Sequence, residues 1–189
     1  ATFEIPPKWA VILNESVYFY RSLNPKYQKR FIEDVAKFLN TVDIVGVEVE
    51  VSLKDRLLVA SSAIIPLFGF AHWHYSHLDE VILYPSAFDK NFNFDNPEIF
   101  INGMVGDGPM EGKMILSKKA LHLGFSNTRD KRNVGIHEFI HLYDKEEGGV
   151  DGIPPVFREQ SFVLPWMQLI KKKINEIVSD ESDIRAYGA

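Results

Sequence analysis

Apolar residues recur at helical spacing through most of the first 40 residues. Trp9, Ile12 and Leu13 lie three to four positions apart, and between residues 27 and 40 the apolar side chains fall on one stripe. Polar residues fill the opposite face, which is the pattern of an amphipathic helix with one buried side. Asn24 and Pro25 interrupt the pattern. The segment therefore predicts N-terminal helices with a break near residue 24.

The next hundred residues mix strand and helix patterns. Residues 46–51 alternate valine with charged residues, which is typical of a half-buried strand, and residues 54–65 have a helical pattern. Glu80–Tyr84 and Lys113–Leu116 are short apolar runs that predict two more strands. Gly103–Gly112 holds four glycines and a proline, which indicates a turn or a flexible loop. Gln160–Val178 predicts a last helix. The order of elements favours an α+β fold with a small mixed sheet.

The segment His137-Glu138-Phe139-Ile140-His141 is an instance of H-E-x-x-H. Residues four apart lie on the same face of a helix, so the two imidazoles can bind one Zn²⁺ ion. Glu138 follows the first histidine, where it can take a proton from a water that zinc activates. About one chain in a hundred of this composition would contain the motif by chance. The motif predicts a zinc peptidase, and a helix with two half-buried surface histidines is the alternative.

The surroundings of the motif favour the metal site. Asn133 can cap a helix, and Ile136, Phe139 and Ile140 would form its buried side. If the two histidines bind one ion, their ring nitrogens should lie within about 4 Å of each other. Asp144 falls on the same face, where it could orient a ligand imidazole. A solvent-exposed carboxylate paired with a lysine explains Asp144 equally well.

Composition narrows the classes of partner and ligand. The chain has 189 residues, no cysteine and a formal net charge of −5. Zinc must therefore be held by histidine and carboxylate. Because there is no basic stripe, nucleic acid is not expected as a partner, and no apolar run reaches the length of a membrane span. The length predicts a single domain over residues 1–189.

Other candidate sites are weaker. His72 and His74 could place two imidazoles on one strand face, but a partly exposed aromatic loop is the favoured interpretation. His122 alone is interpreted as a surface or interface histidine. The short apolar run before the motif could be an unpaired edge strand that pairs with the backbone of an extended peptide. The residues of this predicted substrate strand are Met114, Ile115, Leu116 and Ser117.

Three segments together resemble the Mlc titration factor A family of bacterial zinc peptidases, the glucose-regulated metallopeptidase type. They are Leu78–Phe88, Gly103–Leu121 and Asn133–Pro154. The first includes Tyr84, Pro85 and Phe88, which fit a strand end of that family. The resemblance implies a zincin-like core related to that of anthrax lethal factor. It also implies a cytoplasmic zinc enzyme with aminopeptidase-like activity, a peptide or protein substrate, and a transcriptional-regulator partner in the control of sugar uptake.

One departure concerns the third zinc ligand. The resemblance implies a Glu on a helix that follows a segment similar to residues 184–189, and no position here matches it. We therefore expect the 189-residue form to lack that helix and to bind zinc weakly, with Glu159 as the alternative ligand. Tyr187 is a weak candidate for stabilising an oxyanion. The predicted function is zinc-dependent hydrolysis of peptide bonds. The alternative is a non-catalytic, protein-binding regulator on the same fold.

Overall fold

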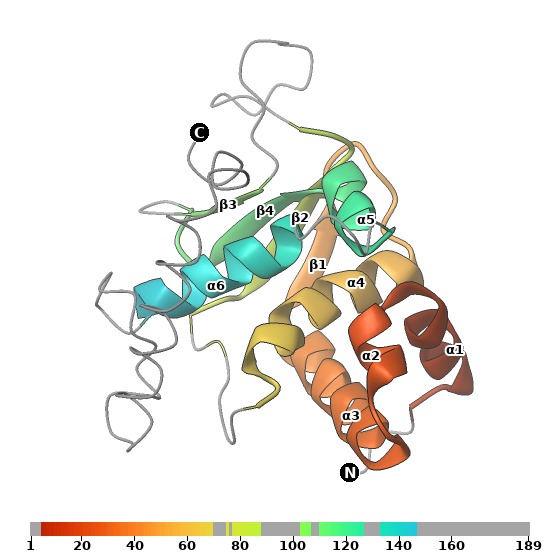
Figure 1. Cartoon of the computed structure of the whole chain (residues 1–189). Coiled ribbons are helices and arrows are strands. Elements are labelled where there is room, and N and C mark those ends of the chain that lie inside the picture. The colour runs from red at the N-terminus through yellow and green to blue at the C-terminus, as the bar shows by residue number, and fades with distance from the viewer. Residues whose placement is uncertain are drawn as a thin grey trace, which may run out of the picture. The chain divides into compact units, whose positions relative to one another are not determined.

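The structure is a computed structural model, and it describes residues 5–69, 75, 77–87, 103–106, 110–126 and 133–146. These residues form helices and a small sheet (Figure 1). The elements in chain order are α1 (Pro7–Ser16), α2 (Tyr18–Ser22), α3 (Pro25–Thr41), β1 (Asp43–Gly46), α4 (Leu53–Ile64), the 3₁₀ helix η1 (Ile65–Leu67), β2 (Glu80–Tyr84), β3 (Gly103–Val105), β4 (Lys113–Ser117), α5 (Lys118–Ser126) and α6 (Val134–Glu146). The predicted mixture of helices and a small mixed sheet is confirmed.

The N-terminal helices follow the sequence pattern closely. The break predicted near residue 24 separates α2 from α3, and Asn24 caps α3 by accepting a hydrogen bond of 3.0 Å from the backbone N–H of Tyr27. Pro25 occupies the first turn of α3, where its missing N–H costs nothing. The apolar stripe of α3 is buried, with Phe31 and Val35 fully inaccessible to solvent. This stripe supplies one wall of the hydrophobic core.

The sheet has four strands in the order β1-β2-β4-β3. The pairs β1–β2 and β2–β4 are parallel, and β3 pairs with β4 in the antiparallel direction. The predicted strands at Glu80–Tyr84 and Lys113–Leu116 are confirmed as β2 and β4. The alternating valines of residues 46–51 do not form a strand. The strand β1 ends at Gly46, before these valines. The chain then bends at Glu48, whose φ is 56°.

The prediction that Met114, Ile115, Leu116 and Ser117 form an exposed substrate strand is wrong. They belong to β4, which is paired with β2 on one side and with β3 on the other. A strand with two neighbours offers no free backbone groups to a peptide. All four side chains are buried, and the Ser117 hydroxyl instead accepts a hydrogen bond of 3.1 Å from the N–H of Ala120 at the start of α5.

One of the two edge strands of the sheet is β3, which lies within the segment predicted to be a loop. Val105 pairs with Met114 and Gly103 with Leu116. The strand has only three residues and begins with glycine, so it has too few side chains to show a period of two. Among the described residues, β3 pairs only with β4. Like β1 at the opposite side of the sheet, it therefore has an outer edge in the part of the chain that the structure describes.

Helices α4 and α6 pack closely against each other beside the sheet (Figure 1). Ser52 and Asp55 form a capping box that starts α4. At the crossing, a Cβ atom on Gly135 would lie 2.8 Å from Cβ of Ser62 and 3.1 Å from Cδ1 of Leu121. A larger residue at position 135 would push α6 away from its neighbours. Glycine there lets α6 approach the core.

The described residues all fall in one compact unit that ends at Glu146. The helix predicted at Gln160–Val178 lies outside the described residues, so the single-domain organisation stays a prediction. Within the described ranges, no helix is both long and apolar enough to cross a membrane.

Candidate metal centre

Helix α6 carries the H-E-x-x-H motif, and its start is fixed as the sequence predicts. The side-chain oxygen of Asn133 accepts a hydrogen bond of 3.1 Å from the N–H of Ile136. Phe139 is fully buried and anchors the other side of the helix. Its ring centroid lies 5.7 Å from that of Phe38 and 5.0 Å from that of Tyr75, in edge and tilted contacts. This packing sets the rotation of α6 about its own axis.

The two histidines converge on the outer face of α6. Nε2 of His141 lies 2.9 Å from Nε2 of His137, which confirms the prediction of a separation within about 4 Å. Two nitrogens bound to one tetrahedral zinc at about 2.1 Å would be about 3.4 Å apart. A small rotation of either ring would reach that separation. Ile140, predicted to be buried, is 43% exposed, so the buried side of the helix runs through Phe139, Leu142 and Tyr143 instead.

The protonation of His137 also fits a metal ligand. Desolvation lowers the pKa of His137, and the positive charge of a protonated His141 lowers it further. A metal binds the neutral imidazole, so a lowered pKa reduces the competition between the proton and the metal. The pair of converging nitrogens and the neutral form together fit two of the ligands of a zinc site.

Glu138 lies on the inner side of the histidine pair. It is only 9% exposed. Burial raises the pKa of Glu138, and the charge of His141 partly opposes that rise. A carboxylate whose pKa is raised toward neutrality is better matched to accepting and returning a proton. The chemistry of the motif therefore has a candidate base, held beside the two imidazoles.

Gly103 is a residue of the site that the motif does not reveal. A Cβ atom there would lie 2.5 Å from Cγ and 2.9 Å from Oε1 of Glu138. The backbone of the edge strand β3 therefore runs directly against the side chain of Glu138. The only sequence signal for it is the glycine-rich segment, whose composition predicts a turn or a flexible loop.

The comparison with known proteins agrees with this geometry. The family model described as glucose-regulated metallo-peptidase M90 matches residues 1–189. The chain belongs to this M90 family. It is also similar to uncharacterized protein slr2042 of Synechocystis sp. (strain ATCC 27184 / PCC 6803 / Kazusa), with 24% identity over 197 residues, 98% of this chain and 71% of the relative.

A catalytic zinc site of the kind found in metallopeptidases has three protein ligands. Within the described ranges, no group of three or more histidine, cysteine or carboxylate side chains is placed to hold an ion. Glu159 and Tyr187 lie outside the described residues. Asp144 lies in α6, but its side chain is not among those described, so both interpretations of it stay open.

The other histidine predictions have mixed outcomes. His72 and His74 lie outside the described residues. His122 is partly exposed, with 36% of its side chain accessible, which agrees with a surface histidine, but its Nε2 also contacts Oδ1 of the fully buried Asp55 at 2.5 Å. The two residues are 67 positions apart, so neither periodicity nor motif spacing could have paired them.

Proposed function

We propose that this M90 family member is a zinc-dependent metallopeptidase that hydrolyses peptide bonds. The observation that supports the proposal most directly is the convergence of the His137 and His141 Nε2 atoms, 2.9 Å apart, beside the buried carboxylate of Glu138. Helix geometry brings residues i and i+4 to one face, and here the two Nε2 atoms lie close enough to bind one ion while the glutamate next to His137 is buried. A bound Zn²⁺ ion would act as a Lewis acid on the reacting carbonyl and water.

In this proposal the chain's own groups have separate roles. His137 and His141 hold the metal through Nε2, and Glu138 acts as general base. A Glu138 carboxylate oxygen accepts a proton from the attacking water and later donates it to the nitrogen of the leaving amine. The raised pKa that burial gives Glu138 suits both transfers, because the group must bind and release a proton within one turnover.

The strand β3 is the proposed place where the substrate backbone aligns. Of the two edge strands in the described sheet, it is the one whose backbone, at Gly103, lies against Glu138. An extended peptide could add to this edge through main-chain hydrogen bonds. Its scissile bond would then lie close to the proposed base. The proposed substrate strand is therefore β3 and not β4, which is paired on both sides.

The finer details belong to the same proposal. They are an aminopeptidase-like, regulatory activity, a cytoplasmic location, a peptide or protein substrate and a transcriptional-regulator partner. They come from the family resemblance, with no support of their own in the geometry. The second candidate function is a protein-binding regulator without turnover. It is favoured by the fact that, in the part of the chain that the structure describes, only two metal ligands come together.

The substitution Glu138→Gln tests the proposal. It keeps the size of the side chain and removes the base, so cleavage of small peptides should fall by about a hundredfold or more while zinc stays bound. Zinc content by atomic spectroscopy and peptide cleavage are measured on the same samples. Glu33→Gln, an exposed change on α3, is the matched control and should keep full activity. Near-normal cleavage by the Glu138 variant would contradict the proposed role, and no cleavage by the unmodified, zinc-loaded protein would favour the regulator.

A further inference from the structure

A cavity lies among the helices. The residues that line it play no part in the candidate metal centre. The cavity has a volume of about 440 Å³ and is lined by residues of α1, α2, α4 and α5. Its size is within the range of small-molecule sites. Neither histidine of the motif, nor Glu138, lines it.

The lining of this cavity has an excess of positive charge. The lining includes three cationic side chains, those of Arg21, Lys54 and Lys119, and one carboxylate, that of Glu15. Its formal net charge, with His122 counted as neutral, is therefore +2. The whole chain, by contrast, has a net charge of −5. Within the described ranges, the ammonium groups of Lys54 and Lys119 make no ion pair. Two unpaired cations on neighbouring helices leave positive charge available for an anion.

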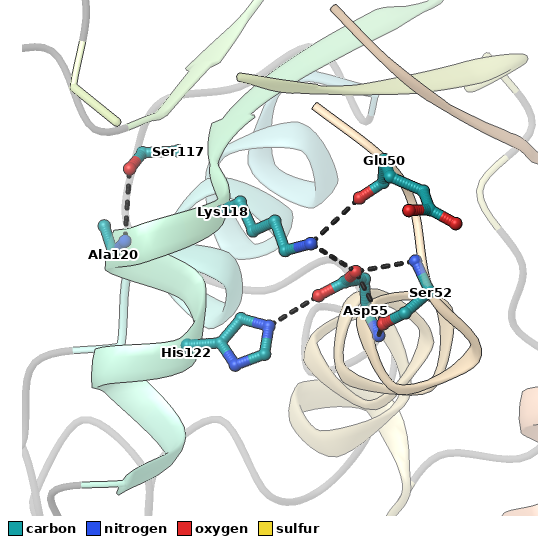
Figure 2. Close-up of polar contacts among 7 residues, drawn as sticks. All are labelled: Glu50, Ser52, Asp55, Ser117, Lys118, Ala120 and His122. Atoms are coloured by element: carbon teal, nitrogen blue, oxygen red, sulfur yellow. Dashed lines mark hydrogen bonds and ion pairs between the residues drawn. The ribbon is translucent and has the colours of Figure 1, made fainter. Parts of the chain in front are cut away.

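His122, which also lines the cavity, belongs to a polar cluster around the buried carboxylate of Asp55 (Figure 2). Its Nε2 contacts Oδ1 of Asp55 at 2.5 Å, while Oδ2 of Asp55 lies 2.9 Å from Nζ of Lys118 and accepts a hydrogen bond of 2.7 Å from the N–H of Ser52. Asp55 is fully buried. Because Lys118 offsets its charge locally, Asp55 does not cancel the cations of the cavity. The cluster therefore holds the imidazole of His122 in a fixed position in the wall of the cavity.

Apart from two serines, the rest of the lining is apolar or aromatic. Leu58 is almost fully buried, Phe125 is half-buried, and Leu123 and Tyr18 are 63% and 60% exposed. Exposed apolar side chains of this size beside unpaired cations match a ligand with both a charged and an apolar part. We propose that this cavity binds a small amphipathic anion, a carboxylate or a phosphate monoester that carries an aromatic or aliphatic group.

The test is an NMR titration of the whole 189-residue protein labelled with ¹⁵N. The probes are 3-phenylpropionate, phenyl phosphate, inorganic phosphate and the uncharged 2-phenylethanol. We expect saturable shifts of amide signals from α4 and α5 with at least one of the two aromatic anions, and weaker binding of inorganic phosphate and 2-phenylethanol. The comparison of the two anions decides between a carboxylate and a phosphate ligand.

Two charge variants make the test specific. Lys54→Gln with Lys119→Gln removes both unpaired cations and should weaken binding about tenfold, as expected for losing charge-assisted hydrogen bonds at a partly exposed site. Lys26→Gln with Lys29→Gln removes the same charge from the exposed face of α3, outside the cavity, and should leave affinity unchanged.

Three results would overturn the proposal. They are no saturable shift with either aromatic anion up to about 10 mM, equal weakening in both double variants, and shifts confined to α6. The last result would place the anion at the metal centre. Because the readout is binding alone, the outcome is independent of whether the protein cleaves peptides.

Discussion

Gly103→Ala should disable the candidate active site without touching the motif. The added methyl group would lie 2.5 Å from Cγ and 2.9 Å from Oε1 of Glu138. Carbon atoms in favourable contact lie about 3.5–4.0 Å apart, so Glu138 or the strand must move by about 1 Å. Cγ is in the middle of the Glu138 side chain and close to the buried backbone of α6, so the carboxylate cannot simply swing aside.

The size of the effect follows from that displacement. A misplacement of about 1 Å at a catalytic group can lower a rate by about a hundredfold, which is about 2.7 kcal/mol of transition-state stabilisation. The three atoms nearest to the new methyl group all belong to Glu138 rather than to a histidine, so zinc content should be unchanged. We expect kcat/KM for a small peptide to fall by about two orders of magnitude while the metal stays bound.

The assay compares peptide cleavage, zinc stoichiometry and the midpoint of urea unfolding for two alanine variants. Gly69→Ala is the control, because a Cβ atom there would meet nothing within 4 Å. It should leave all three quantities close to those of the unmodified protein. A Gly103→Ala protein with normal activity and normal stability would refute the close contact between β3 and Glu138. Loss of zinc together with loss of activity would show that the helix α6, which carries both histidines, had moved, and not the Glu138 side chain alone.

Three further predictions concern the metal, the core and pH. His141→Ala should greatly lower zinc affinity, as measured by competition with a chromogenic chelator, because it removes one of the two converging imidazoles. Phe139→Ala should lower the free energy of unfolding by about 3–5 kcal/mol, while Ile140→Ala, at a 43% exposed position, should change it by less than about 0.5 kcal/mol in urea titrations. Burial alone would raise the pKa of Asp55, but hydrogen bonds from His122, Ser52 and Lys118 outweigh it and lower the pKa from 3.8 to about 2. The unfolded chain therefore binds the proton more readily, and about 2 kcal/mol of stability, complete above about pH 5, should be lost as pH falls to 2. Urea midpoints measured across this range should show a smaller dependence on pH in Asp55→Asn.

The elements that the sequence predicted well are those with long periodic patterns or strong caps. The stripe of α3 spans several turns, and Asn24 and Asn133 each accept the expected capping hydrogen bond. The convergence of His137 and His141 was also predictable, because helix geometry alone places residues i and i+4 together. These are local properties, and local sequence is sufficient to determine them.

The errors concern pairings between distant segments. The position of β4 inside the sheet depends on β3, a three-residue strand with no recognisable pattern, and β4 alone could not reveal that partner. The Asp55–His122 contact and the approach of Gly103 to Glu138 join residues 67 and 35 positions apart. Such contacts depend on how complete helices and strands pack against each other. The periodicity and propensity of a local segment do not predict that packing.

The contact between Phe38 and Phe139 has a consequence for the way the protein is made. These rings are about 100 residues apart in the chain, and together with Tyr75 they close one end of the aromatic core. During synthesis, α3 leaves the ribosome several seconds before α6, at the usual rates of about 5–20 residues per second. Throughout that interval Phe38 can contact Tyr75 but lacks its contact with Phe139. The helix that supplies Phe139 is the same helix that carries the two histidines, so the core and the metal centre are completed in one step.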